Sequence, residues 1–255
     1  MSNFEIQLSI LGPALLAGLI VLSTHVPLGQ QVLARGIVFI DLAIAQIAGL
    51  GVTIAGSFGS EPHGWQVQLA AIGAALAGSV LLTLTERYWP EVQEALIGVL
   101  FVLAACVELL LLANNPHGGE HLKDMLVGQI LWVSPAALWP VAALYAAALA
   151  LWFWRRGDLG HFGFYVLFAV VVTQSVQLVG IYLVFASLII PALAARRFEP
   201  KWRLLAGYTV GVIGYVSGII ASSVLDMPTG AMIVVTMCLT FALSVLLVKA
   251  HPVTW

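Results

Sequence analysis

Charged side chains are scarce in this sequence. They make up 9% of its 255 residues, whereas 61% of the residues are hydrophobic. Soluble domains carry about 25% charged residues, and a water-soluble chain of this size needs far more polar surface to cover its core. The composition therefore excludes an ordinary soluble protein and indicates that lipid is the main solvent of the chain. The formal net charge of -2 gives no reason to expect a nucleic-acid partner.

Cysteine is nearly absent too. Cys106 and Cys238 both lie inside apolar runs, so we expect two small core side chains, without a disulfide or a cysteine metal site. The sequence also lacks a phosphate loop, a nucleophile elbow and a His-Glu-x-x-His motif. We therefore predict no catalytic site and no permanently bound cofactor, and we do not expect an enzyme.

Apolar runs of membrane-spanning length fill the rest of the chain. A span needs about 20 residues to cross about 30 Å of hydrocarbon. We predict an all-α, polytopic transmembrane bundle of about eight to nine spans, forming a single domain over residues 1–255. The candidate spans are residues 4–24, 36–56, 66–85, 92–113, 136–154, 161–178, 180–195, 204–223 and 230–248.

Basic residues orient these spans. They cluster in every second connection, and the connections between contain almost none apart from Lys123. Since cytoplasmic loops are enriched in Lys and Arg, nine spans place the N-terminus outside and the C-terminus inside. The cytoplasmic basic residues would be Arg35, Arg87, Arg155, Arg156, Arg196, Arg197, Lys201, Arg203 and Lys249.

The stretch between Arg156 and Arg196 is short for two complete crossings, which need about 40 residues. We predict two short helices that are broken near Gly180, the second one bent by Pro191. Broken helices at membrane depth are tolerated where protein shields them or where they line an aqueous cavity. This pair is therefore a candidate element of a transport pathway.

Two acidic residues fall within predicted spans, where a carboxylate costs about 2.5 kcal/mol or more. Asp41 either faces the bundle or forms a cap or an ion pair with Arg35. Glu108 lies deeper, on a helical stripe that begins at Glu94, about 21 Å away along the helix axis at 1.5 Å per residue. A cation path is the functional interpretation of Glu108, and a protonated side chain packed against polar neighbours is the alternative.

Other polar residues are weaker candidates. The external segment between residues 114 and 124 contains His117, Glu120 and His121, whose imidazole and carboxylate groups suit divalent metals. A plain polar loop fits this segment equally well, because two glycines interrupt it. Gln174 and Gln177 form a polar patch before Gly180 that either bonds across helices or contacts a partly hydrated ion.

Several motifs in a fixed order give the chain a family resemblance. It resembles the ABC-3 family of metal permeases, the membrane subunits of bacterial zinc, manganese and iron uptake ABC transporters. The matching pieces are Pro27-Leu28-Gly29; Arg35, Asp41 and Gly51; Glu94-Ala95-Leu96-Ile97-Gly98; His117-Gly118 with Leu126-Val127-Gly128-Gln129-Ile130-Leu131; Val179-Gly180-Ile181-Tyr182-Leu183-Val184 with Ile190-Pro191-Ala192; and Asp226-Met227-Pro228-Thr229-Gly230.

The chain departs from the family pattern at two places. Family members commonly have a His four residues after the Asp of the second span, where this chain has Ala45 followed by Gln46. Glu108 or His25 would then have to replace it. Family members also have a longer cytoplasmic segment with a short helix that docks on the ATPase, and only residues 155–161 remain here.

The resemblance implies the permease subunit of a bacterial ABC importer for divalent metal, zinc or manganese, in the inner membrane. It also implies a permease dimer, a cytoplasmic ATPase that hydrolyses ATP, and a periplasmic metal-binding protein. Candidate metal contacts are Asp41, Glu108, His117, Glu120 and His121, with Gln46, Gln174 and Gln177 along the pathway. The shortened cytoplasmic segment leaves two alternatives: an ATPase-independent metal channel or secondary carrier, and a membrane scaffold without transport.

Overall fold

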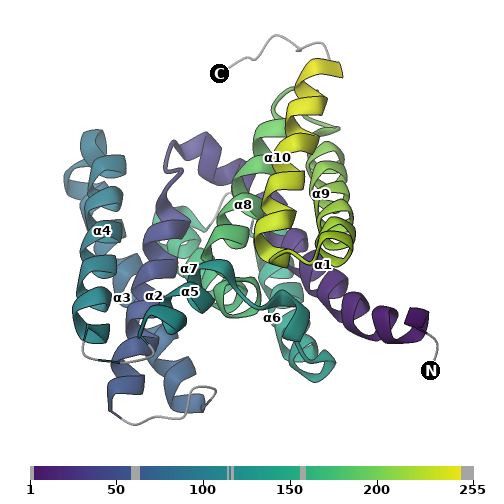
Figure 1. Cartoon of the computed structure of the whole chain (residues 1–255). Helices are drawn as coiled ribbons and strands as arrows, with labels where there is room; N and C mark the ends of the chain where they lie inside the picture. Colours follow the sequence, from purple (N-terminus) through teal and green to yellow (C-terminus); the bar gives the residue numbers. More distant parts are fainter. Residues whose placement is uncertain (1–2, 59–63, 114, 116–117, 156–158, 248–255) are drawn as a thin grey trace. The chain divides into compact units, whose positions relative to one another are not determined.

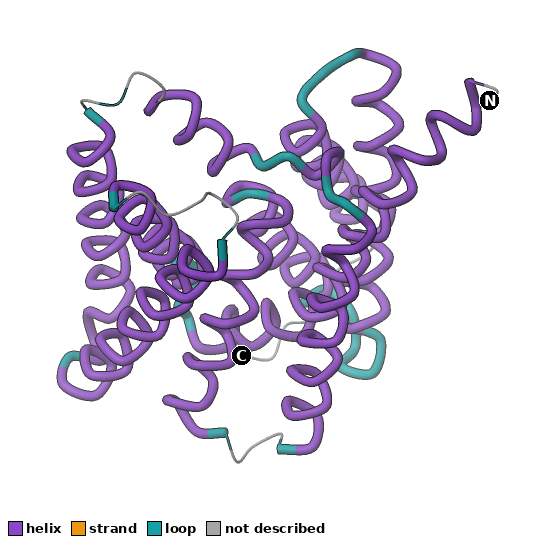
Figure 2. Tube along the Cα trace, turned by 90° about the horizontal axis from the view of Figure 1, so that it is seen from below, coloured by secondary structure: helices purple, strands orange, loops and turns teal. Residues whose placement is uncertain are grey.

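The fold is described from a computed structural model that covers residues 3–58, 64–113, 115, 118–155 and 159–247. Figure 2 shows helices along almost the whole of this part of the chain, which contains no strand. The all-α prediction is confirmed. In chain order the helices are α1 (Asn3–Arg35), α2 (Ile40–Ser57), α3 (Trp65–Tyr88), η1 (Pro90–Val92), α4 (Gln93–Leu112), α5 (Gly118–Val127), η2 (Ile130–Trp132), α6 (Pro135–Trp154), α7 (Gly160–Val179), α8 (Ile181–Ala195), α9 (Arg203–Leu225) and α10 (Thr229–Leu247).

Eight of the described helices are long and apolar enough to cross a membrane, which makes this a multi-pass membrane protein. The ninth predicted span corresponds to α8, which is shorter. At 1.5 Å per residue its 15 residues extend about 22 Å, less than the hydrocarbon thickness of about 30 Å. Most of its residues are buried, as a shielded short helix requires.

Three details correct the sequence expectations. The first helix continues through Pro27 to Arg35, beyond the expected end of the first span at residue 24, so Pro27-Leu28-Gly29 lies within α1. The helix before Gly180 has a full 20 residues, so only one helix of that pair is short. Cys106 and Cys238 are free thiols on exposed faces of their helices, not core residues. The sequence does not separate the two cases, because a helix face that contacts lipid is as apolar as one that contacts protein.

The chain forms two compact units. The first comprises residues 1–35, 127–147 and 178–255. In it α8 packs against α1, α9 and α10, while α9 and α10 form an antiparallel pair (Figure 1). Small residues allow these helices to approach closely: a Cβ atom on Gly214 would lie 2.8 Å from the Cβ atom of Met237.

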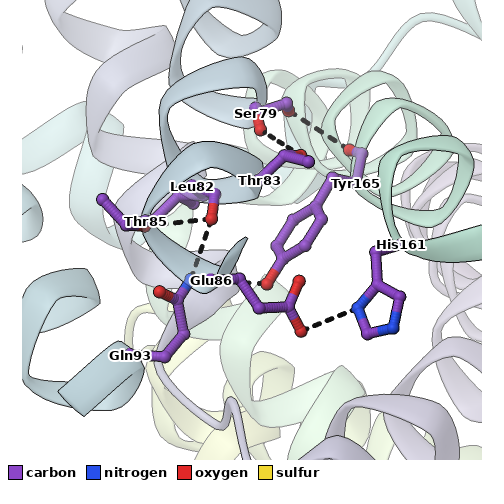
Figure 3. A network of polar contacts seen from close by, with 8 residues as sticks. All are labelled: Ser79, Leu82, Thr83, Thr85, Glu86, Gln93, His161 and Tyr165. Atoms are coloured by element: carbon purple, nitrogen blue, oxygen red, sulfur yellow. Dashed lines mark hydrogen bonds and ion pairs between the residues drawn. The ribbon is translucent and has the colours of Figure 1, made fainter. Parts of the chain in front are cut away.

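The second unit comprises residues 36–126 and 148–177, and α2 packs against α3 and α4. A polar network joins α3, α4 and α7 at one end of this unit (Figure 3). Ser79 Oγ donates to the Tyr165 carbonyl at 3.2 Å, and Gln93 Nε2 donates to the Leu82 carbonyl at 3.0 Å. His161 Nδ1 lies 2.9 Å from Glu86 Oε1. These bonds fix the start of α4, the helix that carries Glu108.

Two glycines fix the break between α7 and α8 in the first unit. Gly180 and Gly128 have φ values of +81° and +71°, which L side chains rarely adopt. Their backbones also touch, because a Cβ atom on Gly128 would lie 2.2 Å from the Val179 carbonyl oxygen, and one on Gly180 would lie 2.4 Å from the Gly128 nitrogen. This crossing accounts for the position of the break.

Replacing Gly128 or Gly180 with Ala is expected to lower the thermal unfolding temperature clearly, since each change adds both backbone strain and a clash with backbone atoms. Gly73→Ala is the matched control, because nothing lies within 4 Å of its Cβ position inside α3. The measurement is thermal unfolding of the purified chain in detergent. Equal melting of Gly180→Ala and Gly73→Ala would contradict the account of the break.

Candidate functional site

Glu108 of α4 is the centre of a buried polar cluster in the second unit. Its side chain is completely buried, and both carboxylate oxygens accept hydrogen bonds from α2. Gln46 Nε2 donates to Oε2, and Thr53 Oγ1 donates to Oε1 at 2.8 Å. A carboxylate inside a span is stabilised by such donors, because the hydrocarbon offers none.

The cluster follows from the helical spacing on α2. Gln46, Gly49 and Thr53 are separated by three and four residues, so they share one face of the helix. Gly49 leaves room for the neighbours of this face, because a Cβ atom there would lie 2.1 Å from Met125 Cε and 3.9 Å from Glu108 Oε1. Sequence analysis found Gln46 and Glu108 but missed Thr53, which the spacing from Gln46 would have revealed.

Glu94, the other acid of the α4 stripe, also contacts the second helix. Its Oε1 accepts a hydrogen bond from the Phe39 backbone N–H at 3.2 Å, just before α2 begins. The residues between the two acids on this stripe are half-buried. Glu94 is thus bonded at the residue that precedes α2, Glu108 is bonded to α2 itself, and the two acids are separated by most of the length of α4.

Asp41 lies in the first turn of α2 and is 1% exposed. Neither of its oxygens hydrogen-bonds another side chain in the described part of the chain, so the predicted ion pair with Arg35 is not observed. The N-terminal end of a helix favours a negative charge, which stabilises a carboxylate at this position. Asp41 is thus a buried acid at the start of α2 without a side-chain partner among the described residues.

The external candidates are only partly described. His117 lies outside the described residues, and so does the side chain of His121. Glu120 is exposed in the first turn of α5. The expected glycine-interrupted loop is therefore wrong for residues 118–127, where Gly118 and Gly119 begin a helix. No group of three or more His, Cys, Asp or Glu side chains that could hold a metal occurs among the described residues.

Gln174 and Gln177 bond across helices, which was one of the two interpretations of the sequence. Gln174 Nε2 donates to Gln68 Oε1 at 3.2 Å, and Gln68 Nε2 donates to Gln177 Oε1 at 2.5 Å. Gln68 begins α3, so these amides join α3 to the end of α7. Gln68 was not singled out by the sequence, because an isolated Gln near a span end carries no distinctive signal.

His25, the possible substitute for the missing family histidine, is completely buried in α1. Its Nδ1 lies 2.9 Å from the Val21 carbonyl oxygen of the preceding turn. Its Nε2 has no hydrogen-bond partner in the described structure. His25 is therefore bonded within its own helix and does not join the cluster around Glu108 in the described structure.

Comparison with known proteins decides the family. The sequence model of the ABC 3 transport family matches residues 7–164 and 156–248. The chain belongs to this family.

Individual relatives agree with this assignment to the ABC 3 family. The manganese transport system membrane protein MntC of Halalkalibacterium halodurans is 27% identical, over 85% of this chain and 80% of the relative. A Haemophilus influenzae protein named "Probable iron transport system membrane protein" is 25% identical, over 86% and 83%. Among solved structures, PsaBC of Streptococcus pneumoniae matches with a TM-score of 0.78 and 22% identity, over 95% of this chain and 94% of that chain, which supports the same fold.

Replacing Thr53 with Val is expected to destabilise the chain by about 1–2 kcal/mol, because it leaves one oxygen of Glu108 buried without its donor. Ser57→Ala is the matched control on the same helix, since Ser57 bonds only to the Ile54 carbonyl of its own turn. Thermal unfolding in detergent measures both variants. If Thr53→Val melts at the temperature of Ser57→Ala, the hydrogen bond to Glu108 contributes nothing.

Proposed function

We propose that this chain is the permease subunit of a bacterial ABC importer for divalent metal ions, with residues 1–255 acting as one transmembrane permease domain in the inner membrane. The completely buried Glu108, held by two donors from α2, is the observation that carries the proposal. Intramembrane acids mark ion pathways because their cost must be offset by a function or by a partner. Family membership supports the same conclusion.

Manganese is the cation that the donor set favours. The Glu108 carboxylate and the Thr53 hydroxyl offer oxygen, while the Gln46 amide faces the carboxylate with its Nε2; this set contains no imidazole or thiolate. Oxygen ligands suit manganese, whereas imidazole and thiolate suit zinc. Ala45 occupies the position where family members commonly have a His, which removes a nitrogen ligand from this span. The name of the Halalkalibacterium relative supports manganese, and that of the Haemophilus relative keeps iron as a second candidate.

In the proposed mechanism a periplasmic binding protein delivers the metal at the external segment that contains His117, Glu120 and His121. The ion then passes Glu108, near the end of α4, and afterwards Asp41, in the first turn of the neighbouring helix α2. Gln46 exchanges its bond to Glu108 for water or metal during passage. Gln174 and Gln177 hydrate the path at the end of α7.

A cytoplasmic ATPase supplies the energy, and two permeases form the transporter. The permease itself hydrolyses no ATP. The positive-inside count that places the N-terminus outside also places the connection from α6 to α7 on the ATPase side. This connection is short, since α6 ends at Trp154 and α7 begins at Gly160. That observation favours the second candidate function, an ATPase-independent carrier derived from the family.

Glu108→Gln and Asp41→Asn are each expected to reduce manganese accumulation by about tenfold or more, which corresponds to about 1.4 kcal/mol of lost interaction with the ion. Both changes keep the side-chain volume and remove the negative charge. Glu91→Gln is the control, because Glu91 is exposed in η1. The measurement is radiolabelled manganese uptake in cells that express each variant at equal level. Unchanged uptake in both buried variants would favour a scaffold without transport.

The energy source is tested in proteoliposomes that contain the chain with or without the ATPase encoded beside it. We expect manganese uptake only with the ATPase and ATP, because a permease without its motor has no means of driving an ion against a gradient. Uptake by the chain alone, sensitive to a proton gradient, would overturn the coupling and support the carrier.

A further inference from the structure

An apolar groove lies between α9 and α10 in the first unit. Its volume is about 490 Å³, and carbon atoms form almost all of its lining. The residues used below are Phe198, Trp202, Ile213, Thr240, Leu243 and Leu247. Beyond the groove, α9 and α10 pack closely at Gly214 and Gly218. The groove is therefore confined to the start of α9, next to residues 198–202, and to the end of α10 at Leu247.

The groove has the length of one leaflet. Trp202 and Ile213 are 11 residues apart along α9, which corresponds to about 16 Å at 1.5 Å per residue. Half of the hydrocarbon thickness of a bilayer is about 15 Å. Trp202 is half exposed at one end of the groove, as expected for an indole at the membrane interface. An extended acyl chain that starts at this interface would therefore end near the bottom of the groove.

Positive charge is concentrated in the segment that contains the lining residues Phe198 and Trp202. The connection between α8 and α9 contains one acid, Glu199, and three basic residues, and a fourth begins α9; the basic residues are Arg196, Arg197, Lys201 and Arg203. Two guanidinium groups are fixed at the rim. Arg197 donates to the Val245 carbonyl at 3.1 Å, and Arg203 Nε donates to the Phe198 carbonyl at 3.3 Å. Lys201 pairs with Glu199 at 2.9 Å and is 70% exposed.

We propose that this groove binds an anionic phospholipid, with one acyl chain between α9 and α10 and the phosphate beside Arg197, Lys201 and Arg203. Such a lipid complements the site: its apolar acyl chain matches the apolar groove, and its negatively charged phosphate matches the basic residues. Basic pockets at the cytoplasmic side of transmembrane helices bind anionic headgroups for this reason. The site shares no residue with the proposed metal path, and only its assignment to the cytoplasmic leaflet rests on the proposed topology.

Charge also argues against a second copy of this chain in the groove. Two permeases in one membrane share their orientation, so a symmetric contact through this face would bring one basic rim against the other. Like charges at an interface oppose association. A phospholipid phosphate neutralises the rim instead.

The test is native mass spectrometry of the full chain, purified from membranes that contain phosphatidylglycerol and phosphatidylcholine in equal amounts. We expect one phosphatidylglycerol to remain bound per chain. Thr240→Trp fills the groove and should abolish this retention; the Thr240 hydroxyl bonds only within its own helix, to Thr236, so its loss leaves no cross-helix partner unpaired. Ile220→Trp, on the exposed outer half of α9, is the control and should retain the lipid.

Lys201→Gln provides a second variant that does not disturb packing, because this side chain is exposed. It should lower the preference for phosphatidylglycerol over phosphatidylcholine about fivefold. Two results would each overturn the proposal: equal retention of the two lipids by the unmodified chain, or unchanged lipid retention in Thr240→Trp. If retention is unchanged and a dimer dissociates in Thr240→Trp, the groove belongs to a second copy of the chain.

Discussion

The hydrocarbon core offers no water to solvate a carboxylate, and this constraint governs the arrangement of α2 and α4. Glu108 is completely buried, so each of its oxygens needs a donor from the protein. Gln46 and Thr53 supply these donors from one face of α2. Between them Gly49 leaves room on the same face for the end of the Met125 side chain. A polar group placed here is thus compatible with folding, and the proposed metal path would require a cation to replace its donors.

The first unit solves a related problem with its backbone. A helix of 15 residues is too short to cross the hydrocarbon alone, so α8 is buried among α1, α9 and α10. The break at Gly180 is possible because Gly128 brings its own backbone against it, without a side chain on either residue. Irregular backbone at membrane depth is thereby shielded by protein, as it must be. The apolar groove between α9 and α10 lies in the same unit.

Much of this architecture follows from the sequence. Apolar runs of about 20 residues predict the spans, and the stretch between Arg156 and Arg196, which is too short for two complete spans, predicts the break near Gly180. Contacts between distant helices do not follow. Gln68 looks like an ordinary residue of an apolar span until the helices are placed side by side, and only the spacing from Gln46 distinguishes Thr53. Cys106 and Cys238 were assigned to the core because a span that faces lipid on one side is as apolar as one that faces protein.

The central claim is that Glu108 itself meets the transported cation. Infrared difference spectroscopy tests it most directly, by comparing the carboxylate stretching bands of the reconstituted transporter with and without manganese. The account predicts a metal-induced band shift in the unmodified chain that is absent from Glu108→Gln, because the cation replaces the donors Gln46 and Thr53 at the carboxylate oxygens. Identical difference spectra for the two proteins would contradict it.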